Sequence, residues 1–137
     1  MRRIIAIVLI GAALLSLAGC AADQRSQTLT ETLLAYGNAI RWNGFQSALQ
    51  FVDPKVRKAH PLTPLDIARY QQVRVSDYDD DAGAVPVSQN EVQQMVKIGL
   101  INRNTQVERT VIDHQTWRYD PKLHRWWLES GLPDITQ

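Results

Sequence analysis

The sequence predicts an α+β domain in which N-terminal helices pack on one face of an antiparallel sheet of about four strands. Apolar residues recur every three or four positions over residues 29–52, which is the spacing of one helix face. Farther along the chain, apolar and polar residues alternate, as in strands that bury a single face. Helices followed by a run of strands indicate the α+β class.

The first helix of the domain is predicted to begin at Thr28, which has the spacing of a capping box with Glu31. Gly44 interrupts the apolar pattern, and a second short helical stripe follows it and ends before Pro54. We therefore expect two packed helices or one kinked helix. Residues 55–66 contain two further prolines and are predicted to form an irregular connection.

The alternating segments predict four strands, over about residues 73–76, 92–100, 107–119 and 124–129. Asp120 and Pro121 predict the turn of the last hairpin, because proline presets a turn conformation after aspartate. Residues 102–104 interrupt the preceding pair of strands and predict a second hairpin turn.

Asp77, Asp79 and Asp81 have the spacing with which a calcium-binding loop begins. Such a loop needs a glycine at its sixth position and a bidentate carboxylate at its twelfth. This sequence has Ala82 and Ser88 there. We therefore interpret the stretch as a solvated acidic hairpin loop, and we expect neither a metal nor another cofactor.

The N-terminus has the layout of a secretory signal peptide. Arg2 and Arg3 precede an apolar run over residues 4–17, and small residues separate this run from Cys20, the single cysteine of the chain. The run is shorter than the 20 or so apolar residues that a membrane-spanning helix needs.

The sequence Leu17-Ala18-Gly19-Cys20 resembles the lipobox of bacterial lipoproteins. The resemblance implies cleavage before Cys20 and acylation of its sulfur and of its new amine. Several acyl chains are needed, because a single chain binds a membrane only reversibly. In this family an acidic residue after the cysteine favours the inner membrane of Gram-negative bacteria. Ala21 stands there, which implies attachment to the periplasmic face of the outer membrane.

These patterns divide the chain into a signal peptide (1–19), the lipidated cysteine with a polar tether (20–27), and a single domain (28–137). Loss of both leader arginines leaves 13 basic against 14 acidic residues. This near-neutral balance argues against nucleic acid as a partner and against membrane binding by charge. The lipid alone is expected to hold the protein at the membrane.

Residues 36–45, the Asp53-Pro54 pair and the hairpins that end at Trp126-Trp127-Leu128 resemble the nuclear transport factor two-like (cystatin-like) superfamily. This resemblance implies a cone-shaped α+β fold in which the sheet curls around a long helix. In that superfamily the cone encloses a pocket, which some members use for catalysis and many others for binding or dimerisation.

Isomerase-like members of this superfamily abstract a proton with an aspartate that lies beside a tyrosine in the apolar cone. The corresponding arrangement in this chain would be Asp113 with Tyr70 or Tyr119, and the pKa of Asp113 would have to be adjusted by the apolar site. The alternative is an aspartate on the sheet surface that is hydrogen-bonded across the strand.

Trp126 and Trp127 are neighbours in a predicted strand, so one ring should enter the core and the other should face away from it. Trp127 together with Ile112 is a candidate docking surface, since tryptophan is enriched in interface hot spots. The alternative is that residues 131–133 or an edge of the sheet cover Trp127.

The function that we favour from sequence is a non-enzymatic, lipid-anchored periplasmic protein of the outer membrane. Its domain would bind an envelope protein, a second copy of itself or a small apolar ligand in the cone, by shape and aromatic burial. The alternatives are a lipid-anchored enzyme that uses the pocket aspartate as a general base, and a structural component of an envelope assembly. An enzyme needs an open cavity with a titratable group at its floor.

Overall fold

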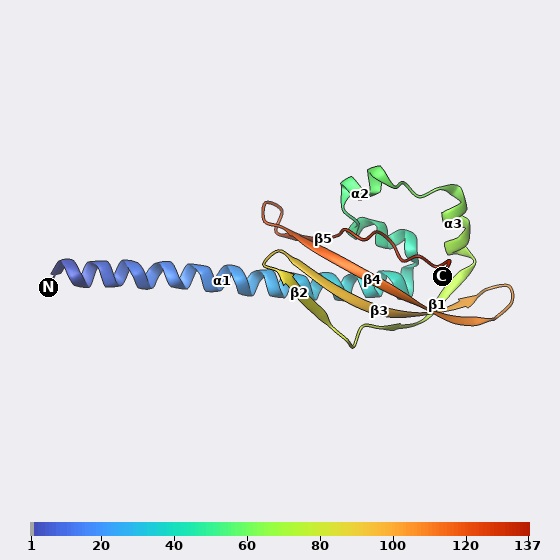
Figure 1. Ribbon diagram of the computed structural model, residues 1–137, viewed down its shortest axis with the longest axis horizontal. Coiled ribbons are helices and arrows are strands. Elements are labelled where there is room, and N and C mark those ends of the chain that lie inside the picture. Colours follow the sequence, from blue (N-terminus) through green and yellow to red (C-terminus); the bar gives the residue numbers. More distant parts are fainter. Residues whose placement is uncertain (1) are drawn as a thin grey trace.

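The computed structural model describes the backbone of residues 2–137 and the side chains of residues 19–137. A long N-terminal helix extends from one end of a domain of short helices and a curved sheet (Figure 1). The predicted signal peptide, except Gly19, lies outside the described side chains.

Five helical segments precede five strands. The helical segments are α1 (Arg2–Asn38), the π-helical turn η1 (Ala39–Asn43), the 3-10 helix η2 (Phe45–Phe51), α2 (Pro54–Ala59) and α3 (Pro64–Gln71). The strands are β1 (Val73–Asp79), β2 (Ala84–Ser88), β3 (Glu91–Asn102), β4 (Glu108–Asp120) and β5 (Arg125–Leu128). This order confirms the predicted α+β class.

The strands form one antiparallel sheet in the order β1-β3-β4-β5, and β2 pairs with β3 beyond the end of β1. The sheet curls into a half-barrel, and the C-terminal part of α1 runs along it (Figure 1). Helices packed on a curved antiparallel sheet are therefore confirmed. The prediction of about four strands missed β2, a short edge strand that contains Pro86 and leaves Val85 and Val87 exposed.

The core lies between the concave face of the sheet and α1, η1 and η2. Alternate residues of β3 and β4 supply the sheet side: Val92, Val96, Ile98, Leu100, Val111 and Trp117. From α1, the fully buried ring of Tyr36 meets Trp117 edge to face, with 5.1 Å between ring centroids. Gly37 allows close approach of helix and sheet, because a Cβ atom there would lie 3.0 Å from a ring carbon of Tyr78.

Residues 21–27, the predicted polar tether, are helical, because α1 is continuous through them. The capping box at Thr28 is wrong, since the Thr28 hydroxyl donates to the Gln24 carbonyl one turn earlier, at 2.7 Å. Contacts with the sheet hold this segment. The Arg25 guanidinium donates to the Gln89 carbonyl at 2.8 Å and lies 5.2 Å from the centroid of the Tyr119 ring.

The predicted irregular connection over residues 55–66 contains α2 and the start of α3 instead. Pro54 and Pro64 open these helices, where the fixed φ and missing N–H of proline are tolerated. Asp53 caps α2 by accepting from the Lys55 amide at 2.7 Å, and Thr63 forms a capping box that begins α3. Pro54 and Pro64 mark helix starts, and the irregular segment is limited to residues 60–63, which include Pro61.

The turns of the two long hairpins are confirmed, but the predicted acidic loop begins farther along the chain than expected. The Asp120 carboxylate accepts from the amides of the β4–β5 turn, and the Asn102 amide oxygen does so in the β3–β4 turn. Asp77 and Asp79 belong to β1 rather than to a loop, and Asp79 lies 3.8 Å from Lys97 of β3. The turn itself follows Asp79.

The Tyr36 ring is expected to contribute strongly to stability, whereas its hydroxyl is not. This hydroxyl is buried and has no protein hydrogen-bond partner among the described residues. We predict that Tyr36→Ala lowers the free energy of unfolding by about 3–5 kcal/mol, because it removes a core aromatic ring. Tyr36→Phe, the matched control, is expected to change it by less than about 1 kcal/mol or to raise it. Urea denaturation measures both, and an equal loss in the two variants would contradict the assignment.

Candidate functional site

Four side chains form a buried polar cluster on the concave face of the sheet: Asp113, Gln115, Trp117 and Tyr78. The Gln115 amide nitrogen donates to Asp113 at 2.8 Å and to the Tyr78 hydroxyl at 3.1 Å. The Trp117 indole N–H donates to the Gln115 amide oxygen at 3.1 Å. Residues at alternate positions of β4 share one face, which is why the strand places three of these groups side by side.

Burial dominates the electrostatics of this cluster. Asp113 is 7% exposed, and burial raises the pKa of its carboxyl to about 6, while the Gln115 hydrogen bond and the charge of His114 act in the opposite direction. Burial likewise raises the pKa of Tyr78 and of Tyr36, and the nearby Asp113 charge adds to both shifts. Burial thus disfavours the charged form of Asp113 more strongly than its Gln115 hydrogen bond and His114 favour it.

The two tyrosines that sequence reasoning paired with Asp113 have other partners. The Tyr70 hydroxyl donates to the Pro133 carbonyl at 3.0 Å. Tyr119 lies six residues from Asp113 on the same strand, which corresponds to about 20 Å, and its hydroxyl lies 3.2 Å from Nδ1 of His124. Gln115 and Tyr78, which the sequence analysis missed, contact the cluster instead. The alternation of Asp113, Gln115 and Trp117 could have indicated Gln115.

The predicted docking face through Trp127 is not available on this chain. Trp126 and Trp127 are 2% and 8% exposed, and the Arg125 guanidinium lies 4.1 Å from the Trp127 ring centroid. Trp126 donates from its indole N–H to the Arg25 carbonyl at 3.1 Å, so α1 covers it. Ile112 is half-buried on the convex face of β4. As predicted for neighbours in a strand, Trp126 belongs to the core cluster and Trp127 does not. Trp127 is nevertheless buried, because the Arg125 side chain covers its ring.

Cys20, the predicted lipidation site, is exposed on α1. It precedes Arg25, which contacts the sheet, by five residues, or about 7 Å of helix. Among the residues whose side chains are described, no helix combines the length and the hydropathy needed to cross a bilayer.

Asp113 lines none of the surface depressions of the described residues, but Gln115 of the polar cluster lines one of about 430 Å³ together with Met95 and His114. Two other depressions, on the helical side of the domain, differ in size. The larger, about 610 Å³, lies between η2, α2 and the C-terminal segment and is lined by apolar and polar side chains, among them Leu49, Val56, His60 and Leu132. The smaller, about 270 Å³, is the arginine cavity, defined by Arg41, Trp42, Phe45, Tyr70, Arg74 and Arg103. Its arginines come from η1, from β1 and from the β3–β4 turn, so no local sequence pattern indicates it.

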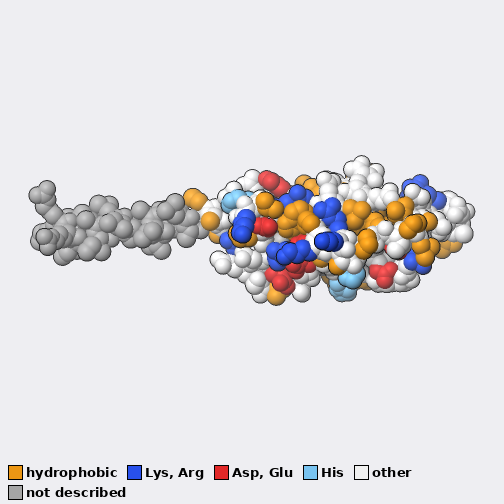
Figure 2. All heavy atoms as spheres, turned by 90° about the horizontal axis from the view of Figure 1, so that it is seen from above, with side chains coloured by type: hydrophobic (Ala, Val, Ile, Leu, Met, Phe, Trp, Pro, Cys, Tyr) orange, Lys and Arg blue, Asp and Glu red, His pale blue; other side chains and the backbone are white. Residues whose placement is uncertain are grey.

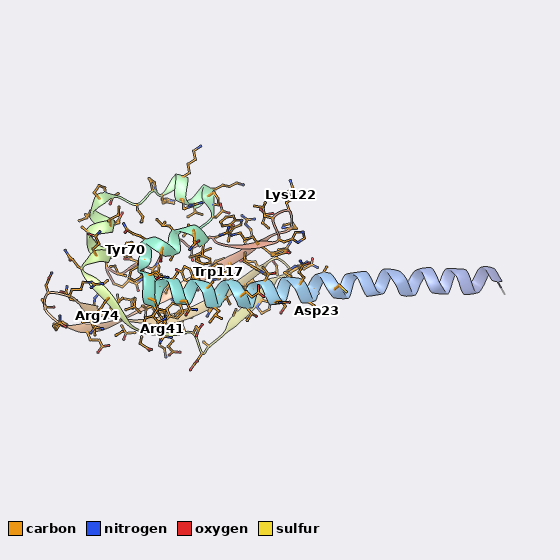
Figure 3. The ribbon with its side chains drawn as sticks, turned by 180° about the vertical axis from the view of Figure 1, so that it is seen from behind. Asp23, Arg41, Tyr70, Arg74, Trp117 and Lys122 are labelled. Carbon is orange, nitrogen blue, oxygen red and sulfur yellow. The ribbon has the colours of Figure 1, made fainter. Side chains whose placement is uncertain are left out.

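Charges elsewhere on the molecule are mixed. Figure 2 shows basic, acidic and apolar side chains interspersed on the face seen from above, as the near-neutral composition predicts. Figure 3 shows Arg41, Arg74 and Tyr70 at one end of the domain, and Asp23 and Lys122 toward the other end, where the N-terminal part of α1 emerges. The arginine cavity and Cys20 therefore lie at opposite ends.

No protein-family model matches this chain, and neither a curated protein nor a solved structure matches it. The half-barrel sheet with its packed helix is compatible with a cone-shaped fold. A function is therefore argued from the geometry of the residues described above.

The raised pKa of Asp113 predicts how stability depends on pH. The carboxyl has a pKa of about 6 in the folded chain against an ordinary value of 3.8, so the folded protein binds a proton in this window that the unfolded chain does not. The free energy of unfolding should therefore fall as pH rises from about 4 to about 6, by up to about 3 kcal/mol, and should then stay level.

The variant Asp113→Asn is expected to lose this pH dependence and to exceed the parent in stability at pH 7.5, because it keeps an acceptor for Gln115 without the buried charge. The exposed Asp23→Asn serves as the control and should follow the parent. Thermal denaturation between pH 4 and pH 8 measures the effect. Identical pH profiles for Asp113→Asn and the parent would rule out this role of the carboxyl.

Proposed function

We propose that this chain is a lipoprotein of the bacterial envelope, attached through acylated Cys20 to the periplasmic face of the outer membrane, with a domain that binds a ligand or partner. The observation that carries the proposal is the lipobox-like Leu17-Ala18-Gly19-Cys20 after an apolar run led by two arginines. Membership of the nuclear transport factor two-like superfamily is part of the same proposal.

The surroundings of Cys20 support this attachment. An exposed cysteine is accessible to a modifying enzyme, and about 7 Å of helix separates it from the first side chain that contacts the sheet. Lipids at this position would hold the β2–β3 turn, which Arg25 contacts at Gln89, close to the headgroups. The helix would leave little slack between membrane and domain.

The filled interior supports binding rather than catalysis. Tyr36, Trp117 and their neighbours fill the concave side of the sheet. Asp113 lines none of the depressions on the described residues, although its hydrogen-bond partner Gln115 lines one of about 430 Å³. A substrate that exchanged a proton with Asp113 would need an open route to it.

A lipid-anchored enzyme that uses Asp113 as general base is the second candidate. The observation that favours it is the pKa of Asp113, which burial raises to about 6, near the range of catalytic bases. This function requires α1 to move away from the sheet so that a substrate can reach the carboxylate. The contact of Tyr36 with Trp117 opposes that movement.

Expression in a Gram-negative bacterium tests the proposed function. The chain is expected in the outer-membrane fraction, and its intact mass should correspond to a mature form that begins at an acylated Cys20. Cys20→Ala is expected to lose the lipid and the mature N-terminus. Ser26→Ala, on the same helix, is the control and should behave as the parent. An unmodified thiol on the parent chain would contradict the proposal, and an acylated chain in the inner membrane would contradict only the outer-membrane assignment.

A further inference from the structure

The arginine cavity concentrates positive charge without neutralising it. None of the residues that line it is an aspartate or a glutamate. The ion pairs of the described side chains engage Arg69, Lys97 and Arg118, and none of them includes an arginine of the cavity. Three arginines are among the lining residues, their like charges repel each other, and an anion bound at the depression would relieve that repulsion.

The guanidinium groups retain free hydrogen-bond donors. Arg103 uses its Nε to donate to the Val73 carbonyl at 3.2 Å, which leaves its terminal nitrogens for a ligand. Arg41 and Arg74 are exposed, and no hydrogen bond engages their side chains among the described residues. Arginine is the side chain that best matches the geometry of a carboxylate or a phosphate.

Aromatic rings lie next to these charges. Phe45 and Tyr70 stack with 4.6 Å between ring centroids, and both line the cavity. At its rim, Trp42 is 75% exposed, whereas the other tryptophans are at most 8% exposed. The Arg41 guanidinium lies 5.6 Å from the Trp42 ring centroid. An exposed indole beside an arginine favours a ligand that carries a flat apolar ring as well as a negative charge.

The backbone explains why these two side chains are presented together. Arg41 and Trp42 lie in the π-helical turn η1, and such turns occur frequently at functional sites. Gly44 ends this turn with φ of 83°, a value that favours glycine. The turn buries Ile40 in the core and leaves Arg41 and Trp42 exposed.

We propose that the arginine cavity binds a small organic anion, a carboxylate or phosphate on a planar apolar ring, with Arg41, Arg74 and Arg103 contacting the anionic group and Trp42 covering the ring. This inference rests on the proposed binding function and names its ligand class. The cavity volume of about 270 Å³ lies below the roughly 300–1,000 Å³ of pockets for drug-sized ligands, so the ligand is small. About 30 Å of helix separates Cys20 from Arg41, so the ligand comes from solution rather than from the membrane that holds the lipid.

Titration of the full lipidated chain in neutral detergent tests this inference, with phenyl phosphate as the probe. Inorganic phosphate and benzyl alcohol present its two halves separately. Calorimetry should give a dissociation constant of about 1 mM or tighter for phenyl phosphate, and at least about tenfold weaker binding for each half. Tryptophan fluorescence should change with the same midpoint, because Trp42 is the exposed indole.

Variants locate the site. Arg41→Gln and Arg74→Gln should each weaken phenyl phosphate by about tenfold or more, while Arg57→Gln, on α2 outside the cavity, should stay within about twofold of the parent. Trp42→Ala should weaken phenyl phosphate and leave inorganic phosphate unchanged. The two arginine substitutions are at exposed positions and should not alter the melting temperature.

Several results would overturn the inference. One is the absence of saturable binding up to about 10 mM phenyl phosphate. Another is unchanged affinity for phenyl phosphate in Arg41→Gln and Arg74→Gln. A third is inorganic phosphate that binds as tightly as phenyl phosphate. The intact mass of the same sample separates this inference from the proposed attachment. An acylated chain that binds no probe contradicts the ligand class alone, and an unmodified chain that binds it contradicts the anchor alone.

Discussion

The contact between Tyr36 of α1 and Trp117 of β4 joins the helix to the sheet, and the position of the other features depends on it. It places a helix along the concave face of the half-barrel, so that the interior is filled by side chains. Gly37 supports the same close approach, since it faces the Tyr78 ring. Because α1 fills the interior, a ligand has to bind at the surface of the domain, as at the arginine cavity.

The buried polar cluster is a consequence of this packing. A carboxylate on the concave face has to be accommodated beneath α1, and Gln115 satisfies part of its hydrogen-bonding capacity while bridging to Tyr78. Burial without a cationic partner keeps the pKa of Asp113 high and disfavours its charged form. The cluster therefore affects the stability of the folded chain. It would take part in chemistry only if the helix left the sheet.

Sequence patterns predicted the parts of the fold that depend on neighbours along the chain. The alternation of Val92, Val96 and Ile98 with polar residues indicated a one-faced strand, and Gly44 marked the break after the first helix. Pro64 was misread, because a proline is equally compatible with an irregular segment and with the first turn of a helix. Residues 21–27 are helical, and within them Arg25 contacts Gln89 and Tyr119, which are distant in sequence and not indicated by any local pattern.

The candidate sites also differ in whether neighbouring residues in the sequence indicate them. Cys20 has a local motif and was predicted from it, whereas the three arginines of the arginine cavity come from three separate elements and form no such motif. Trp127 had a local pattern that correctly predicted its strand. Its cover, the Arg125 side chain, depends on a side-chain conformation that periodicity does not specify.

Hydrogen exchange of the full chain in detergent, followed by mass spectrometry of its peptides, tests the docking of α1 most directly. If the helix packs on the sheet from Arg25 onward, amides of residues 25–38 should exchange as slowly as those of β3 and β4, because opening them requires separation of helix and sheet. Exchange of residues 25–38 at the rate of an unstructured chain, beside a protected sheet, would contradict the account.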